Sequence, residues 1–223
     1  MRDVVKAEEG ETFDIELEAD LLKANEQLAE NNRKMLKRNG IIAVDVMGSI
    51  GAGKTSLIDQ LVKTLKGRHH IAVLNGDLTT TIDADILGQH SIPVVQINTG
   101  KECHLDANLV EKALKKLELE KLDLIFIENV GNLICPAEFP LGSEKRIVVI
   151  SLTEGPYIVV KHPHSFLNAD VAVINKVDLA DAMDLDIEKM KGDIRRVNPN
   201  VKLVETNCRT GGGIAEAADA LGL

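Results

Sequence analysis

The sequence predicts an α/β fold in which helices cover both faces of a largely parallel β-sheet. Short runs of β-branched and aliphatic residues recur along the chain, and segments with helical periodicity separate them. Both faces of these runs are apolar, which is typical of strands buried inside a parallel sheet. We expect about seven strands, near residues 41–47, 71–74, 94–97, 122–127, 147–152, 171–174 and 201–204.

Three segments, residues 14–37, 107–119 and 186–196, have the spacing of amphipathic helices. The first ends near Asn39-Gly40, a common helix end. We therefore expect residues 1–39 to form a polar tail and a helix, and the α/β domain to follow it. This leading helix either packs on the flank of the domain or binds a partner.

The composition limits the classes of function. A net charge of −9 and a pI near 5.2 disfavour a protein that neutralises a nucleic-acid backbone. Aromatic residues make up only 2% of the chain, so stacking on nucleic-acid bases is also poorly supported. The absence of a long apolar run and of a basic leader predicts a soluble, cytoplasmic protein that does not bind membranes. Three cysteines do not form a disulfide framework.

A complete phosphate-binding motif, G-x-x-x-x-G-K-[ST], follows the first predicted strand and precedes a helical pattern. Its glycines let backbone N–H groups surround phosphate oxygens, Lys54 neutralises the outer phosphates, and the Thr55 hydroxyl is placed to bind Mg²⁺. An ordinary glycine-rich turn is the alternative, but the Lys-Thr pair and the flanking elements favour the phosphate loop. The predicted phosphate-binding residues are Gly48, Ser49, Gly51, Ala52, Gly53, Lys54, Thr55 and Ser56.

An N-K-x-D motif that ends at Asp178 follows the sixth predicted strand. The Asp178 carboxylate can accept two hydrogen bonds from the N1–H and N2–H₂ groups of guanine, which adenine lacks, so we expect the nucleotide to be GTP. Lys176 would lie along the base, and Asn175 would tie this loop to the phosphate loop. A polar loop after the last strand can present backbone N–H groups to guanine O6 from Asn207 and Cys208, although the usual S-A-K form is absent.

Acidic residues follow two further strands. GTP-hydrolysing switches usually carry D-x-x-G where this chain has Glu128 and Gly131, and the glycine N–H then contacts the γ-phosphate. The longer Glu128 side chain can still reach a metal-bound water. Asp77 either completes the Mg²⁺ shell or orients the attacking water, or it belongs to a solvated Asn-Gly turn. We therefore predict Lys54, Asp77 and Glu128 as catalytic residues, and Thr55, Asp77 and Glu128 as Mg²⁺ ligands.

Cys103 and His104 are adjacent at the start of a predicted helix, and Cys135 lies four residues beyond Gly131. Two thiolates and an imidazole suit Zn²⁺ or Ni²⁺, and a helix N-terminus favours the thiolate form. Three ligands leave such a site incomplete, so solvent or a second subunit would complete it. The alternative is that these are simply buried cysteines, since an adjacent Cys-His pair is not a standard zinc-finger pattern.

In this order, the motifs GSIGAGKT, NGD, GxxCHLDA, IENVGNLICP and NKVD resemble those of the HypB family, the nickel-incorporation GTPases of hydrogenase maturation. The resemblance extends from Asp14 onward. It implies a P-loop NTPase of the SIMIBI class, related to the nitrogenase iron protein, with a GTPase domain over residues 40–223 and a GTP-dependent homodimer. It also implies that Cys103, His104 and Cys135 bind Zn²⁺ or Ni²⁺, and that the partners are a HypA-like nickel/zinc accessory protein and the hydrogenase large subunit.

Two departures from the family and its relatives matter. Residues 1–40 contain neither Cys nor His, so the N-terminal nickel store of some members is excluded. The related ATPases place a trans-acting lysine at the second position of the phosphate loop, where this chain has Ser49. Lys161 is the candidate for a residue that reaches the nucleotide across a dimer.

The functional hypothesis is a switch. GTP and Mg²⁺ would hold the segments of Asp77 and Glu128 in one arrangement, and the short link from Gly131 to Cys135 would pass this state to the metal site. Three alternatives stay open: a metal-binding protein with a purely structural nucleotide site, a urease-type nickel accessory GTPase, and a P-loop kinase. The NKVD motif argues against the kinase, and the CHLDA and LICP segments with the leading helix argue against the urease relative.

Overall fold

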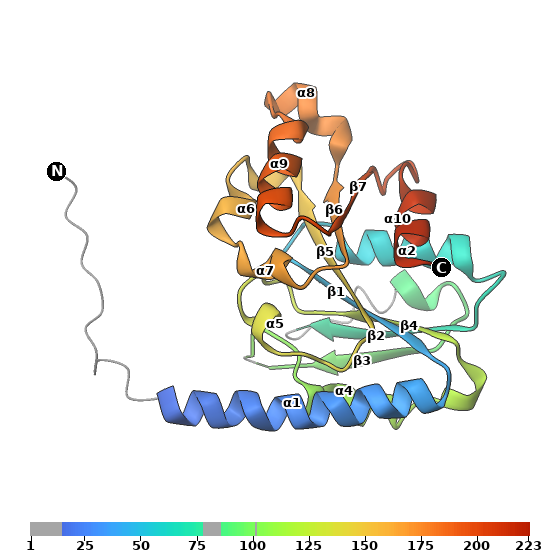
Figure 1. Cartoon of the computed structure of the whole chain (residues 1–223). Helices are drawn as coiled ribbons and strands as arrows, with labels where there is room; N and C mark the ends of the chain where they lie inside the picture. The colour runs from blue at the N-terminus through green and yellow to red at the C-terminus, as the bar shows by residue number, and fades with distance from the viewer. Residues whose placement is uncertain (1–14, 78–85, 101) are drawn as a thin grey trace.

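The computed structural model describes residues 15–77, 86–100 and 102–223, with side chains from Asp20 onward. The predicted polar tail over residues 1–14 lies outside the described residues. Seven strands form one sheet in the order β3-β2-β4-β1-β5-β6-β7, and every neighbouring pair is parallel (Figure 1). This confirms the predicted fold. The strands are β1 (Ile42–Gly48), β2 (Ile71–Asp77), β3 (Val94–Asn98), β4 (Leu124–Glu128), β5 (Lys145–Ser151), β6 (Val171–Asn175) and β7 (Lys202–Thr206).

Helices cover both faces of the sheet. The α-helices are α1 (Ile15–Arg38), α2 (Lys54–Leu65), α4 (Ala107–Leu114), α5 (Cys135–Glu138), α6 (Ile158–Lys161), α7 (His164–Leu167), α8 (Ala180–Met183), α9 (Ile187–Val197) and α10 (Ile214–Leu221). Short 3₁₀ turns are η1 (Leu119–Lys121), η2 (Leu152–Glu154) and η3 (Val177–Leu179). Figure 1 shows α2 and α10 on one side of the sheet and α1 with α4 on the other. No helix in the described part of the chain is long and apolar enough to cross a bilayer.

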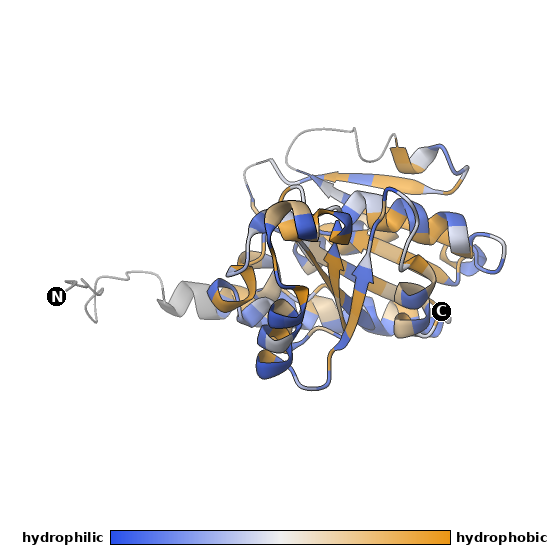
Figure 2. Ribbon diagram, turned by 90° about the horizontal axis from the view of Figure 1, so that it is seen from above, coloured by the Kyte–Doolittle hydropathy of each residue, from blue (hydrophilic) through white to orange (hydrophobic). Residues whose placement is uncertain are grey.

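Successive residues of β1 point to opposite faces of the sheet, and both faces are buried, which explains why all but one of its side chains are apolar. Val44 and Val46 join the apolar cluster beneath α2 and α10, whereas Ala43 and Met47 join clusters on the opposite face. Figure 2 shows the apolar strands enclosed by helices with hydrophilic outer surfaces. Asp45 interrupts this pattern, because it is a fully buried carboxylate in the middle of the strand.

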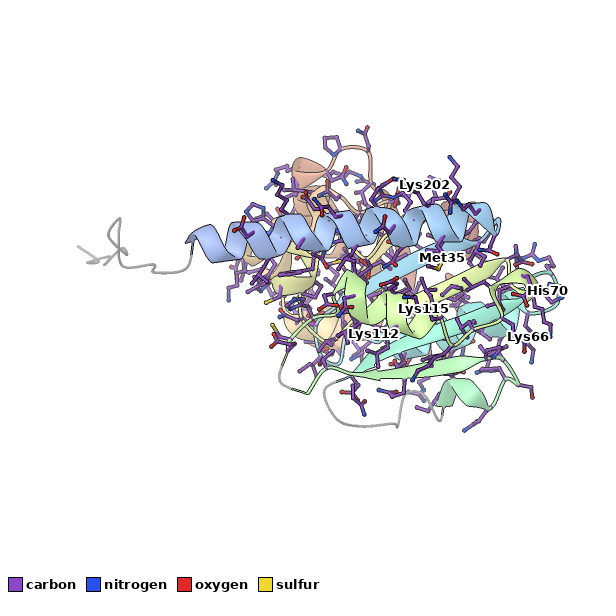
Figure 3. All side chains as sticks on the ribbon, turned by 90° about the horizontal axis from the view of Figure 1, so that it is seen from below. Met35, Lys66, His70, Lys112, Lys115 and Lys202 are labelled. Carbon is purple, nitrogen blue, oxygen red and sulfur yellow. The ribbon has the colours of Figure 1, made fainter. Side chains whose placement is uncertain are left out.

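The leading helix α1 packs along α4, as the view from below shows, with Met35 of α1 near Lys115, the residue that caps the end of α4 (Figure 3). Two buried asparagines fix it there. The Asn32 amide donates to the Ala107 carbonyl at 2.8 Å, and the Asn25 side-chain oxygen accepts from the Ala107 N–H at 2.8 Å. Helix α1 therefore lies on the flank of the domain and holds the first residue of α4.

Two of the differences from the sequence prediction affect the site. Strand β2 continues through Asn75 and Gly76 to Asp77, because these residues pair in register with β3, so the Asn-Gly pair is not a turn. Helix α4 begins only at Ala107, where Asp106 caps it by accepting from Leu109 N–H at 2.7 Å. The prediction that Cys103 lies at the start of a helix is therefore wrong, because this cap places Cys103 in the preceding loop.

Candidate nucleotide and metal site

A cavity of about 930 Å³ lies beyond the carboxyl ends of β1, β2 and β4, where ligands of open parallel sheets are usually bound. Its volume suits a ligand of nucleotide size. The cavity wall includes Cys103 as well as residues of the phosphate loop. The predicted nucleotide-site residues that line it are Gly51, Gly53, Lys54, Thr55, Ser56, Asp77, Glu128, Gly131, Lys176 and Cys208.

The phosphate loop turns directly into α2, whose first residue is Lys54. The N-terminus of the helix therefore faces the cavity, an arrangement that attracts phosphate. Lys54 is only 8% exposed, and its ammonium group donates to the Ser49 carbonyl at 3.2 Å. Gly53 has φ +99°, and a Cβ there would lie 2.2 Å from Asn175 Nδ2, so only glycine fits.

Asn175 joins three loops of the site. Its amide donates to the Ala52 carbonyl at 3.0 Å, and its side-chain oxygen accepts from the Thr206 hydroxyl at 3.1 Å and the Cys208 N–H at 3.3 Å. The N-K-x-D segment is thus linked both to the phosphate loop and to the loop after β7. The Cys208 N–H, predicted to face guanine O6, is directed at Asn175 in this structure.

The other members of the proposed base site lie nearby. Lys176 donates to the Gly51 carbonyl at 2.8 Å, so it already spans from its own loop to the phosphate loop. Asp178 lies in η3 with an exposed side chain, and Asn207 closes its own loop by accepting from the Arg209 N–H at 3.1 Å. Their contacts with guanine stay a prediction.

The candidate Mg²⁺ ligands share one wall of the cavity. The Thr55 hydroxyl donates to Glu128 Oε1 at 2.6 Å, and Asp77 lines the same space. A hydroxyl and two carboxylates are the hard oxygen donors that Mg²⁺ prefers. The donor set therefore fits Mg²⁺, and the replacement of the usual aspartate by Glu128 still brings a carboxylate to the phosphate-loop threonine.

Gly131 is pressed against the tip of the phosphate loop. A Cβ at this position would lie 2.5 Å from Ile50 Cγ1 and 3.1 Å from the Ile50 nitrogen. We therefore expect Gly131→Ala to displace the loop and to weaken nucleotide binding roughly 5- to 150-fold, the equivalent of about 1–3 kcal/mol of overpacking. Titration with a fluorescent GTP analogue measures the loss. Gly192→Ala, in α9 with open space around it, is the matched control, and equal affinity of the two variants would contradict the prediction.

The three predicted ligands of the transition metal come together. Cys103 Sγ lies 2.9 Å from Cys135 Sγ and 3.9 Å from His104 Nδ1, and all three ligand atoms lie within 4.8 Å of one another. In the described part of the chain, this is the one group of three or more such side chains at this spacing. In a tetrahedral site with metal–sulfur bonds of about 2.3 Å, the sulfurs would lie about 3.8 Å apart. Metal binding would thus separate the two thiols by roughly 1 Å.

The protonation states of these groups are set by their contacts. The His104 ring lies against Phe139 with centroids 3.9 Å apart, and burial lowers the pKa of His104, which favours the neutral imidazole that binds metals. The pKa of the Cys135 thiol is raised, first because its proton is held in the hydrogen bond between the two sulfurs and second because the group is partly buried. A metal ion must therefore displace protons from the thiol pair to bind.

Two asparagines beside these sites were not predicted from the sequence. Asn129 is fully buried directly after Glu128, and Asn132 forms an isolated backbone bridge with Gly48. Both lie inside the quoted IENVGNLICP motif, and their position after an apolar strand was the available signal. Lys161 ends α6 with an exposed side chain and is not among the residues that line the cavity, so its role across a dimer stays a prediction.

Comparison with known proteins identifies the family. The family model described as CobW/HypB/UreG, nucleotide-binding domain, matches residues 42–205. The "Probable hydrogenase maturation factor HypB" of Methanocaldococcus jannaschii is 52% identical over 196 residues, covering 88% of this chain and 89% of that relative.

Two solved structures are similar over most of their length. The hydrogenase maturation factor HypB from Archaeoglobus fulgidus gives a TM-score of 0.84 at 45% identity, with 89% of this chain and 97% of that chain covered. HypB from Helicobacter pylori in complex with nickel gives a TM-score of 0.84 at 31% identity, with 89% and 93% covered. The chain therefore belongs to the HypB family of hydrogenase maturation factors, within the CobW/HypB/UreG nucleotide-binding domains.

Proposed function

We propose that this protein is a GTP-hydrolysing metallochaperone that assists nickel insertion into the active site of [NiFe]-hydrogenase. The observation that carries the proposal is the shared cavity, in which Cys103 of the metal group and Lys54 of the phosphate loop line the same space. The nickel complex of the H. pylori relative supports nickel as the cargo. The CobW/HypB/UreG match supports a nucleotide as the other ligand.

In this proposal each residue of the cavity has a defined task in GTP hydrolysis. Lys54 and the N-terminus of α2 bind the β- and γ-phosphates, and the Gly131 N–H contacts the γ-phosphate. Thr55, Asp77 and Glu128 would hold Mg²⁺, which neutralises phosphate charge when bound. Asp77 and Glu128 also orient the attacking water, because both carboxylates face the cavity.

The metal site is coupled to the nucleotide through a homodimer in this proposal. Among the residues that the structure describes, one chain offers Cys103, His104 and Cys135 as ligands, so a second subunit or solvent would supply the rest for Ni²⁺ or Zn²⁺. Lys161, exposed at the end of α6, would reach the partner's nucleotide. A HypA-like accessory protein would exchange metal with this site, and the hydrogenase large subunit would receive it.

Molecular mass and metal content, measured together with GDP and with a non-hydrolysable GTP analogue, test this function. We expect a dimer with the analogue and a change in the affinity for Ni²⁺ between the two nucleotides. A monomer whose metal content is the same under all conditions would contradict the proposal. Equal binding of ATP and GTP would instead favour a P-loop kinase.

Asp178→Asn tests whether the N-K-x-D segment selects guanine. The amide cannot accept both guanine donors but can donate to the 2-oxo group of xanthine. We therefore expect the affinity for GTP to fall roughly 10- to 150-fold, the equivalent of about 1.5–3 kcal/mol for hydrogen bonds to a charged group, and the affinity for xanthosine triphosphate to rise. Asp181→Asn, on the exposed surface of α8, is the matched control. Unchanged GTP binding by the Asp178 variant would show that the base is recognised elsewhere.

A further inference from the structure

The end of β4 presents two polar side chains to opposite faces of the sheet. Phe126 belongs to the apolar cluster beneath α2, and Glu128, two residues on, faces the same way and contacts Thr55. Ile127 belongs to the cluster beneath α4, and Asn129 continues on that face. A single peptide bond therefore connects a carboxylate on the nucleotide side with an amide on the side of the Cys103 loop.

Asn129 is held by a chain of buried hydrogen bonds. Its amide donates to Asp45 at 3.2 Å, and Asp45 in turn accepts from Arg146 Nε at 3.1 Å. Its side-chain oxygen accepts from the N–H of Leu105 at 3.0 Å and of Val130 at 3.1 Å. Leu105 follows Cys103 by two residues, so Asn129 connects the metal-binding loop with β1, the strand that enters the phosphate loop.

Asn132 makes a second connection of the same kind. Its backbone pairs with Gly48, the first residue of the phosphate motif. Its side-chain oxygen accepts from the Ile134 N–H at 2.9 Å, and its amide donates to the Cys103 carbonyl at 3.4 Å. One side chain therefore contacts both loops that carry the thiols.

We propose that Asn129 and Asn132 are positioning residues that transmit the state of the nucleotide to the separation of Cys103 and Cys135. The inference rests on the proposed function, in which the nucleotide contacts Glu128 and Gly131. Glu128 directly precedes Asn129 in the chain, and Gly131 directly precedes Asn132. A shift of Glu128 or Gly131 on nucleotide binding therefore moves the neighbouring asparagine. Because buried hydrogen bonds are costly to leave unmade, Asn129 moves the Cys103 loop as a rigid unit.

The coupling is measured by titrating Co²⁺, which gives a thiolate absorption band, and Ni²⁺ into the full chain with GDP and with a non-hydrolysable GTP analogue. For the wild type we expect the two nucleotide states to differ roughly 5- to 150-fold in metal affinity, the usual size of such coupling. For Asn132→Ala we expect the ratio to fall towards one. Its affinity for nucleotide should be unchanged, because this side chain does not line the cavity. Its Co²⁺–thiolate band should shift in energy.

Two variants serve as rescue and control. Asn129→Ala leaves three buried groups without this partner, namely the Asp45 carboxylate and the N–H groups of Leu105 and Val130, and it can fail to fold. We therefore add a double variant, Asp45→Asn with Asn129→Asp, called the exchange variant. It swaps the two side chains and keeps these hydrogen-bond donors matched to acceptors. The exchange variant should fold. The logarithm of its ratio of metal affinities in the two nucleotide states should be at least half of the wild-type value. Asn31→Ala, exposed on α1, should leave both the ratio and the Co²⁺ spectrum unchanged.

The outcomes separate this inference from the function on which it rests. If the wild type binds metal equally well with GDP and with the GTP analogue, the two sites are not coupled. That result would contradict both the proposed switch and the role of the asparagines. A wild-type ratio well above one that persists in folded Asn132→Ala overturns this inference alone. A folded exchange variant without nucleotide-dependent metal binding would also overturn the role given to Asn129.

Discussion

GTP turnover is expected to be lost in Lys54→Ala. Lys54 is the first residue of α2 and is nearly buried at the base of the cavity, where its charge neutralises the outer phosphates. Removing one partner of a buried charge pair costs about 2–5 kcal/mol, or roughly thirtyfold to several thousandfold in affinity. Phosphate release under saturating GTP, with GTP affinity measured separately, distinguishes lost binding from lost chemistry.

Lys66→Ala is the matched control for this variant, because Lys66 is an exposed lysine at the opposite end of the same helix (Figure 3). It should leave turnover and thermal stability unchanged. Circular dichroism verifies that the Lys54 variant is folded. Wild-type turnover in Lys54→Ala would remove the phosphate loop from the mechanism. Lost turnover with intact hydrogenase maturation would favour a purely structural nucleotide site.

Loss of metal binding is expected in Cys103→Ala and in Cys135→Ala. Each variant removes one of three ligand atoms that lie within 4.8 Å of one another. The affinity for Ni²⁺ and Zn²⁺ should fall by more than the roughly 10- to 100-fold that loss of an outer-shell partner costs. Equilibrium dialysis followed by elemental analysis measures the metal content directly.

The third cysteine supplies the comparison. Cys208 is buried in the loop after β7 and contacts Asn175 instead of the metal group, so Cys208→Ala should retain the wild-type metal content. Equal loss in all three cysteine variants would indicate unfolding, which circular dichroism detects. Full metal content in Cys103→Ala would show that the metal binds elsewhere in the chain.

The sheet could be predicted because its strands are apolar on both faces, and the nucleotide loops because their motifs are contiguous in sequence. The order of the strands in the sheet could not be predicted, because it depends on which strands pair when the chain folds. The Asn75-Gly76 pair shows the limit of local signals. Its turn propensity is overridden by hydrogen bonds to β3, and only the folded sheet reveals them.

The geometry of the candidate metal site was harder to predict from the sequence than the fold was. Cys103 and Cys135 are 32 residues apart, and their adjacency depends on where α4 begins and how β4 ends. The buried role of Asn129 requires knowing which face of β4 it occupies, and its partners Asp45 and Leu105 lie far away in sequence. Such long-range polar contacts have no local pattern, so sequence reasoning identified the ligands but not the residues that position them.

Helix α1 is connected by hydrogen bonds to the residue that follows the metal-binding loop, Ala107 at the start of α4. Both backbone groups of Ala107 are bonded to it, the N–H to Asn25 and the carbonyl to Asn32. Pulling or tilting α1 must therefore either carry the start of α4 along or break two buried hydrogen bonds. A chain shortened to begin at β1 would lose both of these hydrogen bonds, while the bonds from Asn129 to Leu105 and from Asn132 to Cys103 would remain.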